Sequence, residues 1–248
     1  MTDLIPLIPL AGLAFLLAGA VKGIAGIGLP TAALGVMTLA IDPRVAISLI
    51  LVPMLATNTW QMIFAGNLAR TFRRYWVFAL CLTLGVSATV FFTASADDRF
   101  LLGALGFVIL LFVWLSWAGW IPPLPDRFDT AAQVLLGLFA GGIGGLTGTW
   151  AAAIAIYLTT RRVDKDEFIR ATGFLIFVGS IPLLFSYLQL GFATLPLLGL
   201  SFAMLVPAFV GMWLGTKVRD RLSPEGFTNA ILGVFVILAA NLLRRAFL

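Results

Sequence analysis

The chain has no histidine, a single cysteine and few charged residues, and each shortage excludes a class of protein. Without histidine it lacks the usual proton shuttle and the commonest metal ligand. Its one cysteine, Cys81, cannot form a disulfide within the chain. Charged residues make up 11% of the 248 residues, whereas a soluble domain carries about 25%. No pair of carboxylates falls within an apolar stretch, so the sequence offers no acid–base catalyst. We therefore expect neither an enzyme nor a bound metal or cofactor.

Long apolar stretches dominate the sequence instead. Hydrophobic residues make up 61% of the chain, and the mean hydropathy is +1.06. Since a transmembrane helix needs about 20 apolar residues, we expect an all-α polytopic membrane protein whose surroundings are the lipid bilayer. The net charge of +5 is typical of basic loops between spans, so we expect no nucleic-acid partner. The expected apolar elements are 4–41, 45–65, 75–94, 101–120, 131–160, 171–190, 195–215 and 227–243.

Two of these elements contain a glycine-rich stretch, and the second stretch repeats the first. Each glycine costs a helix about 1 kcal/mol relative to alanine, so the stretches predict helix breaks. An unbroken helix over 4–41 would be far longer than a bilayer of about 30 Å, so this element must enter and return or cross twice. The repetition divides one membrane domain into halves, 1–125 and 126–248. At a constant offset of 122 residues, Gly19 aligns with Gly141, Gly23 with Gly145, Gly26 with Gly148 and Asp42 with Asp164, both aspartates being expected helix caps.

Basic residues indicate which loops share a side of the membrane. If each glycine element enters and returns, four loops with 11 basic residues lie on one side, and only 4 basic residues lie on the other. If each element crosses once, this bias nearly vanishes. The positive-inside rule favours the first model, which also gives the two halves opposite orientations, as in many secondary transporters. We therefore expect two inverted repeats, each a glycine-broken re-entrant or doubly crossing element followed by three transmembrane helices.

The two breaks are the expected substrate site. A break at membrane depth frees backbone N–H groups, and the helix that follows points them at a ligand, which favours an anion. Lys22, a charge within an apolar element, suits an anionic substrate. Alternatively, the glycines serve close helix packing, Lys22 extends to the surface, Asn58 links helices, and the threonines bond their own backbone. The candidate substrate-binding residues are Lys22, Gly23, Gly26, Gly28, Asn58, Gly144, Gly145, Thr147, Gly148 and Thr149.

Two glycine-rich breaks that each open a half of the chain resemble the sulfite exporter TauE/SafE family. The first has the pattern G-x-x-x-G-x-x-G-x-G-x-P from Gly19 to Pro30. The second, over 141–148, departs from that pattern with Trp150 in place of Gly28. The resemblance covers nearly the whole chain. It implies a transporter of the bacterial inner membrane that exports a small anion, such as sulfite or an organosulfonate like sulfoacetate, by alternating access. A passive anion channel and a membrane scaffold are the alternatives, and the anion, the coupling ion and the oligomeric state stay open.

Overall fold

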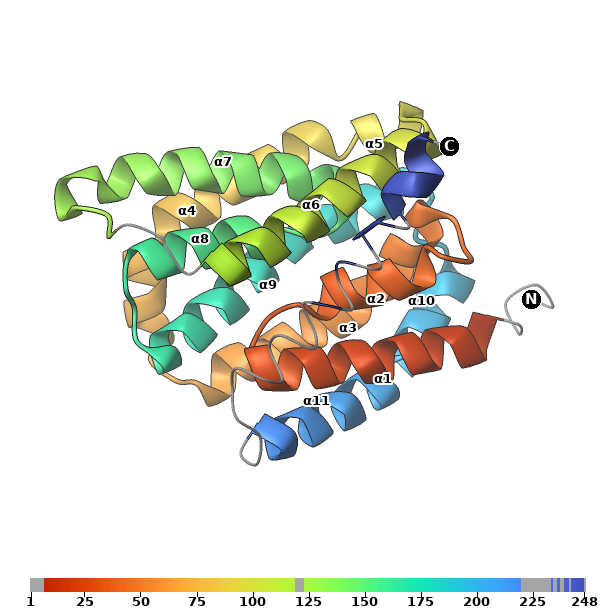
Figure 1. The fold of residues 1–248 in the computed structure, drawn as a ribbon, viewed down its shortest axis with the longest axis horizontal. Helices are drawn as coiled ribbons and strands as arrows, with labels where there is room; N and C mark the ends of the chain where they lie inside the picture. The colour runs from red at the N-terminus through yellow and green to blue at the C-terminus, as the bar shows by residue number, and fades with distance from the viewer. Residues whose placement is uncertain are drawn as a thin grey trace.

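The structure is a computed structural model that describes residues 7–118, 123–219, 233, 236, 239, 240 and 242–247. Every regular element within these residues is a helix, which confirms the predicted all-α fold (Figure 1). The last predicted span, 227–243, lies largely outside the described residues. The elements are α1 (Leu7–Ala25), α2 (Leu29–Met37), α3 (Pro43–Phe64), α4 (Leu68–Thr89), α5 (Phe92–Ser95), α6 (Asp98–Ala118), the 3₁₀ turn η2 (Asp126–Phe128), α7 (Asp129–Thr147), α8 (Ala151–Thr160), α9 (Lys165–Gln189), α10 (Leu195–Ala203) and α11 (Leu205–Arg219).

Six helical stretches among the described residues are long and apolar enough to cross a bilayer. Large apolar side chains on them are exposed, including Leu84 on α4 and Phe185 on α9. Such exposure suits helices surrounded by lipid, where an apolar side chain needs no burial in protein. The chain is therefore a multi-pass membrane protein. The six stretches are Ile8–Ala25, Pro43–Phe64, Leu68–Ser95, Asp126–Thr147, Asp166–Gln189 and Leu195–Val218.

Both predicted helix breaks are present. Helix α1 ends at Ala25, and Gly26 and Gly28 follow with φ of +76° and +99°, a conformation that glycine adopts without a steric penalty. Helix α7 ends before Gly148, whose φ is +68°. At each break the chain turns back, so that α2 packs against α1 and α8 packs against α7. Helix α2 has only 9 residues, about 13 Å, and is too short to cross a bilayer by itself.

Close packing of small residues joins the two halves of the sequence. Helix α1 lies against α11, and a Cβ added at Gly19 or Gly23 would overlap the α11 backbone at Ala208 or Met212. Helix α7 lies against α4 in the same way, and a Cβ at Gly141 would overlap the α4 backbone. The aligned glycines thus make equivalent contacts, as the packing alternative predicts. In Figure 1, α1 begins on the right and α7 on the left, so these equivalent helices run in opposite directions.

Helices α3 and α9 pack against each other between these two pairs. Both begin with the predicted aspartate cap. The Asp42 carboxylate accepts a hydrogen bond from the backbone N–H of Arg44 at 2.7 Å, and the Asp164 carboxylate accepts one from the N–H of Glu167 at 2.8 Å. Each cap satisfies a backbone donor that the helix leaves unbonded. The caps therefore fix where the two central helices start.

The four basic segments predicted as loops gather at one end of the molecule, which we call the basic end, although Arg70, Arg73 and Arg74 lie in the first turns of α4 and not in a loop. Arg74 of α4 forms an ion pair with Glu167 of α9 at 2.6 Å. Arg161, which follows α8, forms an ion pair with Asp126 at 2.7 Å. Helix α11 also ends here, beside the first turns of α9. The loops that the topology argument places on one side of the membrane are therefore close in space, although Arg221 lies outside the described residues.

The opposite end is closed by contacts from the first turns of α3. The Arg44 guanidinium donates to the carbonyl oxygen of Thr93 at 3.0 Å and forms an ion pair with Asp98. The Ser48 hydroxyl donates to the carbonyl oxygen of Phe192, beyond the end of α9, at 3.1 Å. The Ser48 contact joins the two halves of the sequence at this end, and the Arg44 contacts join α3 to the segment that precedes α6 and to the start of α6.

The glycine packing predicts a large effect from a single methyl group. Gly19→Ala should lower the thermal stability of the detergent-solubilised protein, because the added Cβ pushes α1 away from α11, and overpacking of this kind costs about 1–3 kcal/mol. Gly12→Ala, on the same helix, is the matched control, because nothing lies within 4 Å of its added Cβ. Equal melting temperatures for the two variants would contradict the packing role of Gly19.

Candidate functional site

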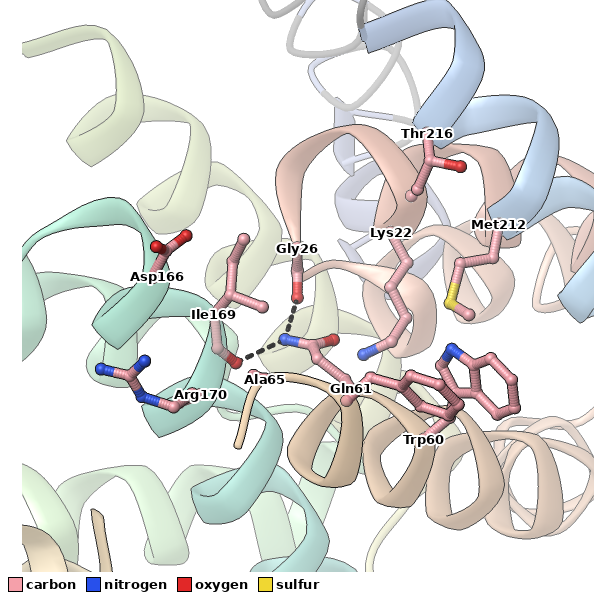
Figure 2. Close-up of a pocket in the computed structure, with 12 residues that line it drawn as sticks. Lys22, Gly26, Trp60, Gln61, Ala65, Asp166, Ile169, Arg170, Met212 and Thr216 are labelled. Carbon is pink, nitrogen blue, oxygen red and sulfur yellow. Dashed lines mark hydrogen bonds between the residues drawn. The ribbon is translucent and has the colours of Figure 1, made fainter. Parts of the chain in front are cut away.

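A cleft of about 440 Å³ opens at the basic end, beside the first glycine break. Helices α1, α3, α9 and α11 form its walls, so both halves of the sequence contribute to it (Figure 2). Its lining is partly apolar and partly polar. The lining residues are Lys22, Gly23, Gly26, Trp60, Gln61, Phe64, Ala65, Asp166, Ile169, Arg170, Met212 and Thr216.

Lys22 brings a buried amino group to this cleft. It lies in the last turn of α1, and only 2% of its surface is exposed. Its Nζ donates a hydrogen bond to Oδ1 of Asn58 at 2.6 Å, and Asn58 in turn donates from Nδ2 to the Met54 carbonyl at 2.7 Å. The one hydrogen-bond partner of the ammonium in the described part of the chain is therefore a neutral amide. The side chain does not extend to the surface.

Gln61 joins the first break to α9. Its Nε2 donates to the carbonyl oxygens of Gly26 at 3.0 Å and Ile169 at 2.7 Å, and it lies 3.1 Å from the Thr172 hydroxyl. Figure 2 shows the side chain between the α1 turn and α9, with its amide group at the centre of the site. This one side chain thus fixes the position of the break relative to the second half of the sequence.

Aromatic and charged side chains complete the cleft. The rings of Trp60 and Phe64 stack with centroids 3.8 Å apart on α3. Across the cleft, Asp166 and Arg170 extend from the first turns of α9 (Figure 2). The Arg170 guanidinium has no hydrogen-bond or ion-pair partner among the described residues, so it can contact an anion entering from the basic end.

The candidate residues of the second half lie elsewhere. Gly145 packs against α4, and a Cβ at Gly148 would lie 3.1 Å from Ile47 on α3. The Thr147 hydroxyl donates a hydrogen bond to the Ile143 carbonyl of its own helix at 2.9 Å. This backbone contact is the alternative to ligand binding that the sequence left open for the threonines. The Thr149 hydroxyl lies 2.9 Å from that of Thr31, at the start of α2, so the two breaks are in contact.

At the first break, the helix end that lines the cleft is the C-terminus of α1 and not the expected N-terminus of α2. The sequence predicts that the N-terminus of the second helix points into the cavity. Instead, the last turn of α1 lines the cleft through Gly23 and Gly26, whereas Gly28 and the first turn of α2 are buried outside it. The physical reason is that Gln61 holds the Gly26 carbonyl toward α9, and Thr31 of α2 bonds Thr149. The cleft therefore carries the α1 lysine together with backbone carbonyls.

Nine of the twelve lining residues were not among the candidates, and Trp60, Gln61 and Arg170 are the three of them with the most evident chemistry. Gln61 lies three residues after Asn58, so helical spacing alone would have placed both on one face of α3. Trp60 lies between them. Arg170 belongs to a charged stretch that reads as a loop, yet α9 begins six residues earlier than predicted and carries Arg170 in its second turn. The capping aspartate, Asp164, was the signal for that earlier start.

The contacts of Gln61 predict that its loss destabilises the break. Gln61→Leu should lower the thermal stability of the purified protein, because it leaves the Gly26 and Ile169 carbonyls without this donor, at a cost of about 1–3 kcal/mol. Gln189→Leu is the matched control at the exposed end of α9, where the amide forms no hydrogen bond to a described residue. Equal stability of the two variants would show that Gln61 does not hold the break.

A comparison with known protein families identifies the chain. The model of the sulfite exporter TauE/SafE family matches residues 11–242, which is nearly the full length and includes both breaks. No curated protein and no solved structure shows significant similarity to the chain. Since the family match covers far more than half of the sequence, the chain belongs to the sulfite exporter TauE/SafE family of membrane transporters.

Proposed function

We propose that the protein exports a small anion, sulfite or an organosulfonate such as sulfoacetate, across the bacterial inner membrane by alternating access. The observation that carries this proposal is the buried ammonium of Lys22, which lines an open cleft and is bonded to a neutral amide. An ammonium taken out of water without an anionic partner costs several kcal/mol. A bound anion would remove that cost, so the site favours small anions over neutral or cationic solutes.

The neighbours of Lys22 suit an anion with several oxygen atoms. We assign Lys22 the charge contact and Arg170 the first contact at the mouth of the cleft. Asn58 holds the ammonium in place at 2.6 Å. We also assign Gly23 and Gly26, which line the cleft, to the site; Gly23 lets α11 approach α1 closely, because a Cβ there would overlap the Met212 backbone.

We further infer that the two halves are inverted repeats. In support, α1 and α7 run in opposite directions (Figure 1), and their aligned glycines pack in the same way. The two breaks also meet equivalent partners: a Cβ at Gly26 would lie 3.3 Å from Ile169, and one at Gly148 would lie 3.1 Å from Ile47. Inverted repeats of this kind build transporters that open alternately to either side around one site.

In this arrangement the described state is open at the basic end. The positive-inside rule assigns that end to the cytoplasm. The anion would therefore enter from the cytoplasm, bind Lys22, and leave after the contacts of Arg44 and Ser48 at the opposite end separate. Export of one negative charge from an inside-negative cell is downhill by about 2.3 kcal/mol per 100 mV, so it needs no coupling ion. We assign Gly28, Gly144, Gly145, Thr147, Gly148 and Thr149 to the site as it exists in the outward-open state.

The Lys22 charge predicts an ordered series of variants. Lys22→Ala should weaken anion affinity about 10- to 100-fold, because a hydrogen bond to a charged group contributes about 1.5–3 kcal/mol. Lys22→Arg should keep partial activity, since the charge survives with a different shape. Lys22→Glu should be worse than alanine, because it repels the anion. The measurement is radiolabelled sulfite counterflow in proteoliposomes, normalised to protein content. Counterflow also distinguishes a carrier from a channel. Transport kinetics of Lys22→Ala equal to those of the wild type would exclude Lys22 from the site.

The topology predicts which residues face the cytoplasm. In a Cys81→Ser background, single cysteines in place of Arg73, Arg127 and Arg219 should react with a membrane-impermeant maleimide only from the cytoplasmic side. A cysteine in place of Arg99, in the loop at the opposite end, is the control and should react only from outside. Labelling of the Arg73 and Arg219 positions from different sides would contradict the inverted-repeat model.

A further inference from the structure

The second break holds a buried tryptophan where the first break holds an open cleft. Trp150 directly precedes α8, and only 2% of its surface is exposed. Its indole lies between α7 and α9: a Cβ added at Gly144 would overlap the ring, and one at Gly179 would lie 3.1 Å from it. The ring therefore fills the space between these two helices.

The repeat places this indole at the counterpart of the Lys22 side chain. The offset of 122 residues aligns Gly144 with Lys22 and Ser180 with Asn58. In the first half, the Lys22 side chain reaches from α1 to Asn58 on α3. In the second half the equivalent helices are α7 and α9. There the indole of Trp150 occupies the space beside Gly144, the residue that aligns with Lys22. One half thus fills this position with an ammonium and the other with an aromatic ring.

The indole carries a hydrogen-bond donor without a partner. Nε1 of Trp150 is buried and bonds no atom of the described residues. The indole N–H can only donate, so its missing partner must be an acceptor. Unpaired buried donors are rare in folded proteins and call for a physical explanation. The cavity beside Trp150 measures only about 10 Å³, room for at most one water molecule, so no anion fits there in the described state.

We propose that Trp150 is the anion-binding residue of the second half, whose indole N–H donates a hydrogen bond to the anion when the protein opens at the opposite end. This inference rests on the proposed function. Contact between Thr31 and Thr149, 2.9 Å apart, keeps the two breaks adjacent. Trp150 fills the second site while the protein is open at the basic end, and its indole N–H binds the anion when the protein is open at the opposite end.

The test removes the N–H and keeps the shape of the ring. Trp150→benzothienylalanine replaces the N–H group by sulfur, in the full-length protein reconstituted into proteoliposomes of known orientation. Radiolabelled sulfite flux is measured from each side. The half-saturating sulfite concentration at the opposite end should rise about tenfold, the loss expected for a hydrogen bond to an anion, and at the basic end it should change less than twofold. The same replacement at Trp114, which is exposed on α6, is the matched control.

Each outcome decides the inference. Unchanged half-saturation at both ends, or an equal rise at both ends, overturns the role of Trp150. A wild-type protein that moves neither sulfite nor sulfoacetate overturns the proposed function instead. If the benzothienylalanine protein does not assemble, the natural sequence is labelled with 5-fluorotryptophan instead. The ¹⁹F resonance of Trp150 is the one that is missing from the spectrum of Trp150→Phe. Saturating sulfite should shift this resonance. A resonance that does not move contradicts the proposal.

Discussion

The ammonium of Lys22 is buried against the side-chain oxygen of Asn58, and the candidate site depends on this one contact. A charge in such surroundings is costly, because the amide replaces only part of the lost hydration. The surrounding residues place Lys22 at the wall of the cleft: Gly23 lets α11 approach α1 closely, and Gln61 holds the turn after α1 in place. The family match identifies a transporter of the sulfite-exporter type, and the proposed function assigns to Lys22 the charge contact with its anion.

The two halves share a packing scheme and differ in chemistry. Gly19 and Gly141 each allow a neighbouring helix to approach closely, and Asp42 and Asp164 each cap a central helix. The difference is concentrated at the breaks, where Lys22 lines an open cleft and Trp150 fills the equivalent space. In our proposal, this difference between the halves accompanies a state that is open at one end of the molecule and closed at the other. This asymmetry is the structural basis of the alternating-access proposal.

The sequence predicted the elements whose causes are local. Excess glycine located both breaks, and hydropathy located the helices within the described residues. The aspartates located the starts of α3 and α9, although the charged residues around Arg170 hid the first turns of α9. The direction in which each break faces could not be predicted, because it depends on contacts between distant segments. Gln61 reaches Ile169, 108 residues away, and Thr31 reaches Thr149, 118 residues away. For the same reason the cleft is lined by the end of α1 and not by the start of α2.

The most direct test of the account asks whether the Lys22 position needs a positive charge. In a Cys81→Ser background, Lys22→Cys should transport sulfite poorly. Alkylation with bromoethylamine, which rebuilds an ammonium at nearly the length of lysine, should restore transport, whereas alkylation with iodoacetamide, which adds a neutral amide, should not. Equal transport by the charged and neutral adducts would contradict the claim that a buried positive charge at position 22 holds the anion.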